Sequence, residues 1–372
     1  MSQNLPKRLV LAALLGCVPA GLAAQAGTKQ DNTPYGTTSA EFLLLGAGAR
    51  GAALGSAYAS IANDVSALYY NPAGTALMTR PGIMVGTYDY VADTRYSWGG
   101  FAVPFSGGSR SAGVQIGTFG FKDQPVYTAD QPDGTGSVYS VNETFVGLTF
   151  AQNFSDRFAA GITAKYISDN LADANGKAFA VDFGTNFHSS LNNHPVKFSF
   201  VLANLGTNIG YSGNPLNSGT TREPLPGEDP VPSIPQPSQL RTKAFPLPTT
   251  FKVGLAYDIV TGSANRMTVL ADFNQPNNSR AGFSGGAEWM SKNLGGSPFG
   301  AALRASYTYS PANNIGPTTL STSLNGEENW QGAALGGGLI YGTGNFSLGV
   351  DYAYRYLGIL GPTHFVSFGL GW

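Results

Sequence analysis

The sequence predicts an all-β fold, a membrane-spanning antiparallel β-barrel of about fourteen strands with an N-terminal hatch in its lumen. Three observations point to this fold. Large apolar residues alternate with small or polar ones along most of the chain, and the alternating segments are even in number. After the N-terminus, no window approaches the ~18 uninterrupted apolar residues that a membrane helix needs. Only 12% of residues are charged, about half the share usual in soluble proteins.

The N-terminus has the features of a secretory signal peptide. Lys7 and Arg8 precede an apolar run from Leu9 to Ala24, and Ala24-Gln25-Ala26 forms a small-residue cleavage site. The residues before Cys17 also resemble a lipoprotein cleavage box, but the residues after it stay apolar, which favours ordinary cleavage. We therefore expect export to the bacterial outer membrane.

This reading divides the chain into three parts: a signal peptide (1–26), an N-terminal extension with the hatch (27–79), and a transmembrane β-barrel (80–372). Cys17 is the only cysteine, so the mature chain would contain neither disulfides nor thiolate metal ligands. The net charge of −1 argues against a nucleic-acid partner.

The strands are predicted from period-2 alternation. In Phe346 to Tyr356 every large apolar residue falls at one parity, and Phe299 to Tyr309 repeats the scheme. A soluble sandwich or propeller would also alternate, but its outward face would be polar, whereas here the second face offers Gly, Ala, Ser and Thr with isolated charges that suit a narrow lumen. These charges are Lys165, Lys197, Asp258, Asp272, Arg304, Asp351 and Arg355. The fourteen strands are expected to start near 82, 94, 110, 139, 156, 176, 195, 248, 265, 280, 297, 331, 345 and 362.

Connection lengths give the orientation. The three longest links, roughly 121–138, 208–247 and 310–330, all follow odd-numbered strands, while links after even strands are short. Outer-membrane barrels have short periplasmic turns and longer extracellular loops, so the odd links are predicted to be extracellular.

The C-terminus alternates up to a terminal aromatic residue. This pattern, from His364 to Trp372, resembles the β-signal that the barrel assembly machinery reads in outer-membrane proteins. We predict that Phe368, Leu370 and Trp372 form this assembly signal.

One glycine pattern near the N-terminus resembles a dinucleotide-binding fingerprint. Gly46, Gly48 and Gly51 have the G-x-G-x-x-G spacing, and Asp64 follows at a suitable distance. The fingerprint needs a following helix and a second parallel strand, whereas here Asn71-Pro72-Ala73-Gly74 precedes an antiparallel meander. We therefore reject a nucleotide site and expect residues of about 38–79 to form short helices and turns that fill the barrel.

This N-terminal segment carries a resemblance to a known family. The runs Gly48 to Tyr58 and Ala62 to Gly74 look like the hatch of the FadL-like superfamily, most closely of its PorV/PorQ family. The resemblance continues through Pro132 to Gly136, Asp156 to Tyr166 and Ala178 to Gly184, and in the second half it rests on strand pattern alone.

The resemblance implies a fourteen-stranded barrel with an N-terminal hatch. FadL members take up hydrophobic compounds such as fatty acids or aromatics, whereas PorV-type members are components of type IX secretion that receive or shuttle exported cargo. By resemblance, the hatch or gating residues are Arg50, Asp64, Asn71, Pro72, Ala73 and Gly74.

No catalytic or metal-binding set stands out, and no cofactor is expected. His188 and His194 fall on one predicted periplasmic turn, and His364 begins the last strand, so no nucleophile with an identifiable base can be named. We predict a protein that is not an enzyme.

Two functions remain. The PorV/PorQ resemblance favours a component of type IX secretion that binds exported cargo or secretion partners. The alternative is a FadL-like transporter for long-chain fatty acids or other hydrophobic small molecules, with an exit through the wall where Gly285-Gly286 or Gly336-Gly337-Gly338 interrupts a strand. In either case outer-membrane lipid and the barrel assembly machinery are expected partners.

Overall fold

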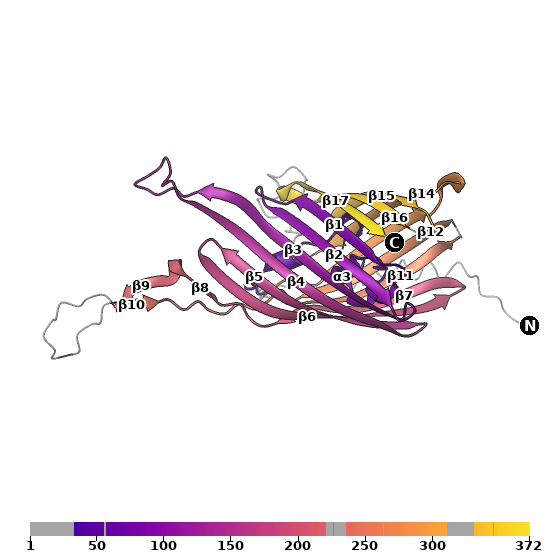
Figure 1. The fold of residues 1–372 in the computed structure, drawn as a ribbon, viewed down its shortest axis with the longest axis horizontal. Coiled ribbons are helices and arrows are strands. Elements are labelled where there is room, and N and C mark those ends of the chain that lie inside the picture. The colour runs from indigo at the N-terminus through magenta and orange to yellow at the C-terminus, as the bar shows by residue number, and fades with distance from the viewer. Residues whose placement is uncertain are drawn as a thin grey trace, which may run out of the picture. The chain divides into compact units, whose positions relative to one another are not determined.

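A closed wall of fourteen long antiparallel strands encloses a lumen in the computed structural model, which describes residues 33–372 apart from 56, 221–225, 227–235, 263, 311–330 and 345. The strands are β1 (Gly82–Asp89), β2 (Arg95–Phe105), β3 (Arg110–Pro125), β4 (Val138–Ser155), β5 (Phe158–Leu171), β6 (Ala174–Leu191), β7 (His194–Gly206), β11 (Thr250–Thr261), β12 (Asn265–Pro276), β13 (Gly282–Ser291), β14 (Phe299–Tyr309), β15 (Ala333–Gly342), β16 (Ser347–Tyr356) and β17 (Pro362–Gly371). The wall closes where β17 pairs with β1, and Figure 1 shows these two strands side by side. Closure leaves neither of these terminal strands with an unpaired edge.

The predicted barrel is confirmed, and every predicted strand start lies within two residues of the observed one. The large apolar side chains also point to the predicted side of the wall. On β14, Phe299, Leu303 and Tyr307 point outward and are exposed, whereas Ala302 and Arg304 are buried in the lumen. Among the other predicted lumenal charges Lys165, Asp258 and Asp272 are buried, while Lys197, Asp351 and Arg355 are partly exposed.

The connections follow the predicted parity with two exceptions, one of which is the link 292–298, which follows an even strand yet is longer than the odd links 90–94, 277–281 and 357–361. The three longest links again follow odd strands of the wall: they are 126–137, 207–249 and 310–332, and most of the last lies outside the described residues. The link from β5 to β6 also follows an odd strand but contains only Ala172 and Asp173, so length fails as a guide to the side at that hairpin. Ala172 has a φ of 52°, in the left-handed region that tight turns use.

Some of the links contain short strands and 3₁₀ turns. The link 207–249 carries β8 (Tyr211–Gly213), η4 (Asn214–Leu216), β9 (Asn217–Thr220) and β10 (Gln236–Gln239), with β8 added to β6 and β9 paired to β10. Two further 3₁₀ turns are η5 (Leu294–Gly296) and η8 (Gly358–Leu360). The turn consists of Asn192 and Asn193, so the prediction that His188 and His194 lie on it was wrong: His188 lies within β6 and His194 begins β7.

The N-terminal segment fills the lumen with four short helices: η2 (Glu41–Leu44), α2 (Ala49–Ala53), α3 (Ala67–Tyr70) and η3 (Pro72–Leu77). We call the segment from Ala40 to Met78 the hatch. η3 packs mainly on β4, β5 and β6, and α2 packs on β15 and β16. The hydrophobic core lies inside the barrel, where Tyr58, Leu54 and Leu68 of the hatch are fully buried. Among the described residues, no helix is long and apolar enough to cross a membrane. The predicted signal peptide and the start of the N-terminal extension lie outside the described residues.

Glycine in the wall lets the hatch approach the strands closely. A Cβ at Gly184 of β6 would lie 2.2 Å from Asn71 Oδ1, and one at Gly161 of β5 would lie 2.6 Å from the carbonyl carbon of Pro72. On the opposite side, a Cβ at Gly336 of β15 would lie 2.5 Å from the Cβ of Ala53. The many glycines therefore have a packing role, because any side chain at these positions would push the hatch away.

Candidate functional site

A buried ion-pair network joins the hatch to the wall, and it contains two of the predicted hatch residues. Arg50 of α2 donates from Nε and Nη2 to the two carboxylate oxygens of Glu288 on β13, at 2.8 and 2.9 Å. Its Nη1 donates to Asp64 Oδ2 at 2.7 Å and to Asn63 Oδ1 at 3.1 Å. Arg50 thus holds both a hatch turn and the wall, and its two bonds to Glu288 form the bidentate geometry that gives strong, directional pairing.

The wall side of this network extends over four strands, β12, β13, β14 and β16. Arg304 of β14 donates from Nε to Glu288 Oε2 at 2.9 Å and from Nη1 to Asp351 Oδ1 on β16 at 2.5 Å. Arg266 of β12 donates to Glu288 Oε1 at 3.2 Å. Glu288 has no exposed side-chain surface and meets three guanidinium groups, which satisfies the rule that a buried charge must be paired. Sequence reasoning missed Glu288, although its inward parity on β13 was a usable signal.

Asp64 is held in its ionised form. Burial disfavours the charge, but Arg50 and the hydrogen bonds from Ser66 and Tyr58 outweigh burial and hold the pKa of Asp64 below its ordinary value of 3.8. Ser66 Oγ donates to Asp64 Oδ1 at 2.5 Å and Tyr58 Oη donates to Oδ2 at 3.0 Å. For Arg50 burial also disfavours the charge, yet Glu288, Tyr58 and Asp64 together raise its pKa well above the usual value. The pair therefore remains charged throughout the neutral range.

The predicted Asn-Pro-Ala-Gly element forms a second anchor, apart from the first. Asn71 Oδ1 accepts from Ala73 N at 3.1 Å and caps η3, while Asn71 Nδ2 donates to Ala59 O at 2.9 Å and to Thr185 O of β6 at 3.2 Å. Pro72 occupies the first turn of η3, where its missing N–H costs nothing. A Cβ at Gly74 would lie 2.0 Å from Ala62 O, so this position requires glycine. Gly46, Gly48 and Gly51, which have the spacing of the rejected nucleotide fingerprint, also lie in the hatch. Asp64, the acidic residue of that pattern, binds Arg50.

A pocket of about 390 Å³ lies in the lumen at the end of the barrel that carries the long links. One wall comes from η2 and the next residue, with Phe42, Leu44 and Leu45. The rest comes from four strands and two links: Tyr90, Phe119, Glu143, Arg355, Leu357 and Phe365. Its lining is mostly aromatic and aliphatic, with a few charged groups, which is the usual composition of a site for a small organic ligand. No sequence pattern predicted this pocket, apart from the inward parity of Arg355.

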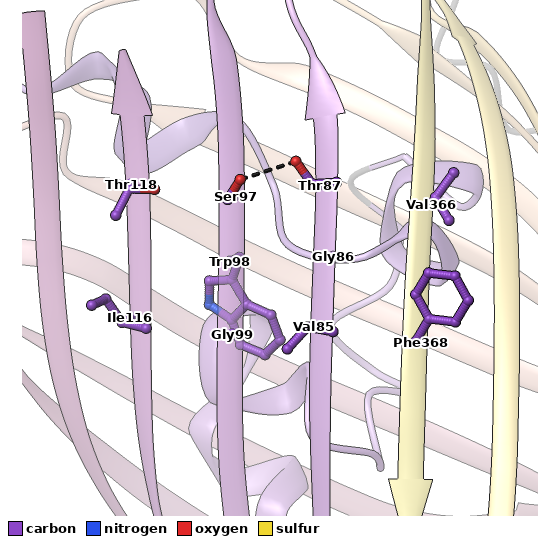
Figure 2. Close-up of a pocket in the computed structure, with 10 residues that line it drawn as sticks. All are labelled: Val85, Gly86, Thr87, Ser97, Trp98, Gly99, Ile116, Thr118, Val366 and Phe368. Carbon is purple, nitrogen blue, oxygen red and sulfur yellow. Dashed lines mark hydrogen bonds between the residues drawn. The ribbon is translucent and has the colours of Figure 1, made fainter. Parts of the chain in front are cut away.

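The outer wall carries a shallow groove of about 460 Å³ across β17, β1, β2 and β3. Figure 2 shows Val85, Ile116 and Phe368 around Gly99, whose outward side carries no side chain to fill the surface. At the end of the groove toward the long links, Thr87 Oγ1 and Ser97 Oγ are hydrogen-bonded at 2.9 Å, the dashed line in Figure 2. The groove is therefore an apolar surface with a polar edge.

The predicted assembly residues lie on this outer surface. Phe368 and Leu370 of β17 are exposed, as is Trp372, whose ring stacks on Phe101 at a centroid distance of 6.0 Å. The backbone N–H of Trp372 donates to Pro81 O at 3.1 Å, so the last residue helps to close the β1–β17 seam.

The predicted wall exits are continuous in the structure. Gly285 and Gly286 pair in register with both β12 and β14, and Gly336 to Gly338 pair with both β14 and β16. These glycines leave the ladders intact, so the expectation of a gap there was wrong. Within the described ranges no group of three or more His, Cys, Asp or Glu residues could hold a metal ion.

No protein-family model and no curated protein matches this sequence. Solved structures with a similar fold include the toluene transporter TbuX of Ralstonia pickettii, which is 12% identical over 89% of this chain and 98% of that chain, with a TM-score of 0.51. The toluene transporter TodX of Pseudomonas putida is 10% identical over 88% of this chain and 96% of that chain, with a TM-score of 0.50. CymD, a monoaromatic hydrocarbon channel, is 11% identical over 88% and 97%, also with a TM-score of 0.50. At such low identity the likeness shows a shared barrel fold.

Proposed function

We propose that this protein is a FadL-like barrel of the bacterial outer membrane that takes up small hydrophobic molecules. The observation that carries the proposal is the lumenal pocket, which is lined mainly by Phe42, Phe119, Phe365 and leucines, and which shares the lumen with an anchored hatch. A molecule that enters from the side of the long links would bind there before it meets the hatch. An apolar ligand gains about 25 cal/mol for each Å² of apolar surface that it removes from water in such a pocket.

The outer wall suits a hydrocarbon environment. Exposed aromatic residues occur near both ends of the strands, as in the aromatic girdles of outer-membrane barrels, in addition to others in mid-strand such as Phe183 and Phe200. Near the short turns they are Phe105, Phe150, Phe154, Phe158, Phe187, Phe299 and Trp372; near the long links they are Tyr166, Phe179, Phe283, Tyr307 and Tyr309. Thr87, Ser97, Thr118, Thr144 and Ser168 stand in one cross-strand row just beyond the latter group, which fits the polar edge of the membrane. In this proposal an acyl chain of outer-membrane lipid fills the groove of Figure 2.

The comparisons support transport over secretion. The solved structures of similar fold are transporters of toluene or channels for monoaromatic hydrocarbons, and none of those named above is a secretion component. The PorV/PorQ assignment, which the sequence favoured, stays a prediction without support from these comparisons. Partners from type IX secretion and exported cargo stay predictions with it.

In this proposal the predicted hatch residues hold the hatch in place, and the hatch closes the lumen. Arg50 and Asp64 fasten α2 and the following turn to β13, while Asn71 to Gly74 fasten η3 to β5 and β6. Passage of a ligand to the periplasmic side would require one of these two anchors to open. In this proposal gating therefore involves two separate anchors, one at β13 and one at β5 and β6.

Uptake by cells tests the proposed function. Cells that lack other hydrocarbon channels would be given labelled toluene at low concentration, with and without this protein. We expect faster initial uptake with the protein, and a return to the background rate in Leu357→Trp, which fills the pocket. Leu335→Trp, which adds the same ring to the outward face of β15, serves as the matched control and should leave uptake unchanged. Equal uptake with and without the protein would reject the proposal.

A further inference from the structure

We propose that the lumenal pocket binds a hydrophobic molecule that carries both an anionic and a cationic group, as an apolar amino acid does; this inference rests on the proposed function. The pocket differs from a purely apolar one because charged side chains of both signs line it. They are Arg355 from β16 on one side and Glu143 from β4 with Glu41 from η2 on the other.

The cationic side of the pocket is Arg355. Within the described part of the chain this guanidinium has neither a hydrogen bond nor an ion pair, in contrast to Arg50, Arg266 and Arg304, which are all paired. Arg355 is only partly exposed, so solvent compensates its charge incompletely. A carboxylate is the group that a guanidinium fork binds best, through two parallel N–H···O bonds.

The anionic side is centred on Glu143. Its carboxyl lies within hydrogen-bonding reach of the Asp169 carboxyl of β5, which is buried and already accepts from Tyr211 Oη at 2.5 Å. The other carboxylate oxygen of Asp169 has no hydrogen-bond partner in the described structure. Two adjacent carboxyls without a neighbouring cation hold one proton between them rather than ionise together, so the pair offers a single negative charge, which a protonated amine beside Glu143 would neutralise. Glu41 is less available, because it already accepts from Thr38 and Asn278.

The aromatic wall binds the body of the ligand. Tyr90 and Phe119 meet edge to face at 6.3 Å on one flank, and Phe365 lies on another. A neutral hydrocarbon would fill this space and displace the water around Arg355 and Glu143, but it would not replace the hydrogen bonds that this water makes. A molecule that supplies both charges offsets the desolvation of both side chains, so among molecules with the same apolar body the pocket should bind the one with both charges most tightly.

Four probes with the same phenyl body test the inference: phenylalanine, 3-phenylpropanoate, 2-phenylethylamine and ethylbenzene. Equilibrium dialysis with the purified full-length barrel in detergent gives the dissociation constants. We expect phenylalanine to bind tightest. Arg355→Gln should weaken phenylalanine roughly tenfold or more while leaving 2-phenylethylamine unchanged, because it removes one charged partner only. Glu143→Gln should weaken phenylalanine similarly and leave 3-phenylpropanoate unchanged.

Each outcome separates the inference from the proposed function. Equal binding of all four probes, or tightest binding of a probe with one charge or none, would overturn the inference and leave the proposed function standing. Failure of every probe to bind would count against both. Arg355→Lys retains the positive charge and should keep the preference for phenylalanine over 2-phenylethylamine in part. Arg95→Gln, at an exposed pair outside the pocket, should change nothing, and a heat-dependent gel shift verifies that each variant is folded.

Discussion

Removal of the Arg50 side chain tests how strongly the hatch is held in the barrel. Arg50 makes four hydrogen bonds, two of them to Glu288, whose side chain is completely buried. Arg50→Met leaves three carboxylates (Asp64, Glu288 and Asp351) with two guanidinium groups, and so one uncompensated buried charge. Loss of one partner from such a pair costs about 3–5 kcal/mol. Because Arg304 and Arg266 still bind Glu288, we expect a loss of about 3 kcal/mol, near the lower end.

Urea unfolding of the barrel in micelles, followed by tryptophan fluorescence, measures this loss. Glu288→Met should cost a similar amount, since it leaves one excess positive charge. The double variant leaves two guanidinium groups with two carboxylates, so we expect it to be clearly more stable than the sum of the single losses predicts. Arg95→Met, in the exposed pair with Asp89, is the control and should have no measurable effect. Additive losses, or a loss below about 1 kcal/mol in Arg50→Met, would refute the reasoning.

The other predictions concern the second anchor, pH and assembly. Asn71→Ala should lower the free energy of unfolding by about 1–3 kcal/mol, because it removes the cap of η3 and the side-chain donor to the buried Ala59 carbonyl; the same urea titration measures it, and no change would contradict the role of the cap. Gly184→Leu should displace η3 and raise the ion conductance of the barrel in planar bilayers, whereas Gly337→Leu, on the outer face, should not. Equal conductance of the two variants would contradict the packing of η3 against Gly184. The pKa of Asp64 is lower in the folded state than the usual 3.8, so its contribution is present above that pH and is lost as the pH falls through the folded value; conductance should stay low from about pH 5 to 8, and opening within that window would contradict the assignment. Deletion of Trp372 should reduce the amount of heat-modifiable barrel in outer membranes, and an unchanged amount would reject the assembly signal.

The wall was predictable from the sequence because its determinants are local. Parity along a strand decides which side chains face outward, and the predicted starts at 82, 110, 265 and 362 coincide with the observed ones. The short turn at Ala172 and Asp173 and the longer link 292–298 were exceptions, because the length of a connection depends on its local conformation and not on the side of the membrane.

The candidate sites were predictable only in part. Resemblance pointed to Arg50 and Asp64, but their wall partner Glu288 is more than 200 residues away along the chain, and only the closed barrel brings it within 2.8 Å. The lumenal pocket combines η2, four strands and the links after β1 and β16, so its lining follows from tertiary packing. The glycines on β13 and β15 were misjudged for a related reason: their neighbours in the ladder cannot be read from the strand alone.

Purification of the tagged barrel from detergent-solubilised outer membranes, with mass spectrometry of the proteins and small molecules that accompany it, tests the central claim most directly. The proposed function predicts a barrel recovered without a stoichiometric protein partner and with a small apolar or amphipathic ligand, which Leu357→Trp should displace. Recovery of a large secretion subunit or of exported proteins in stoichiometric amounts, without such a ligand, would contradict it.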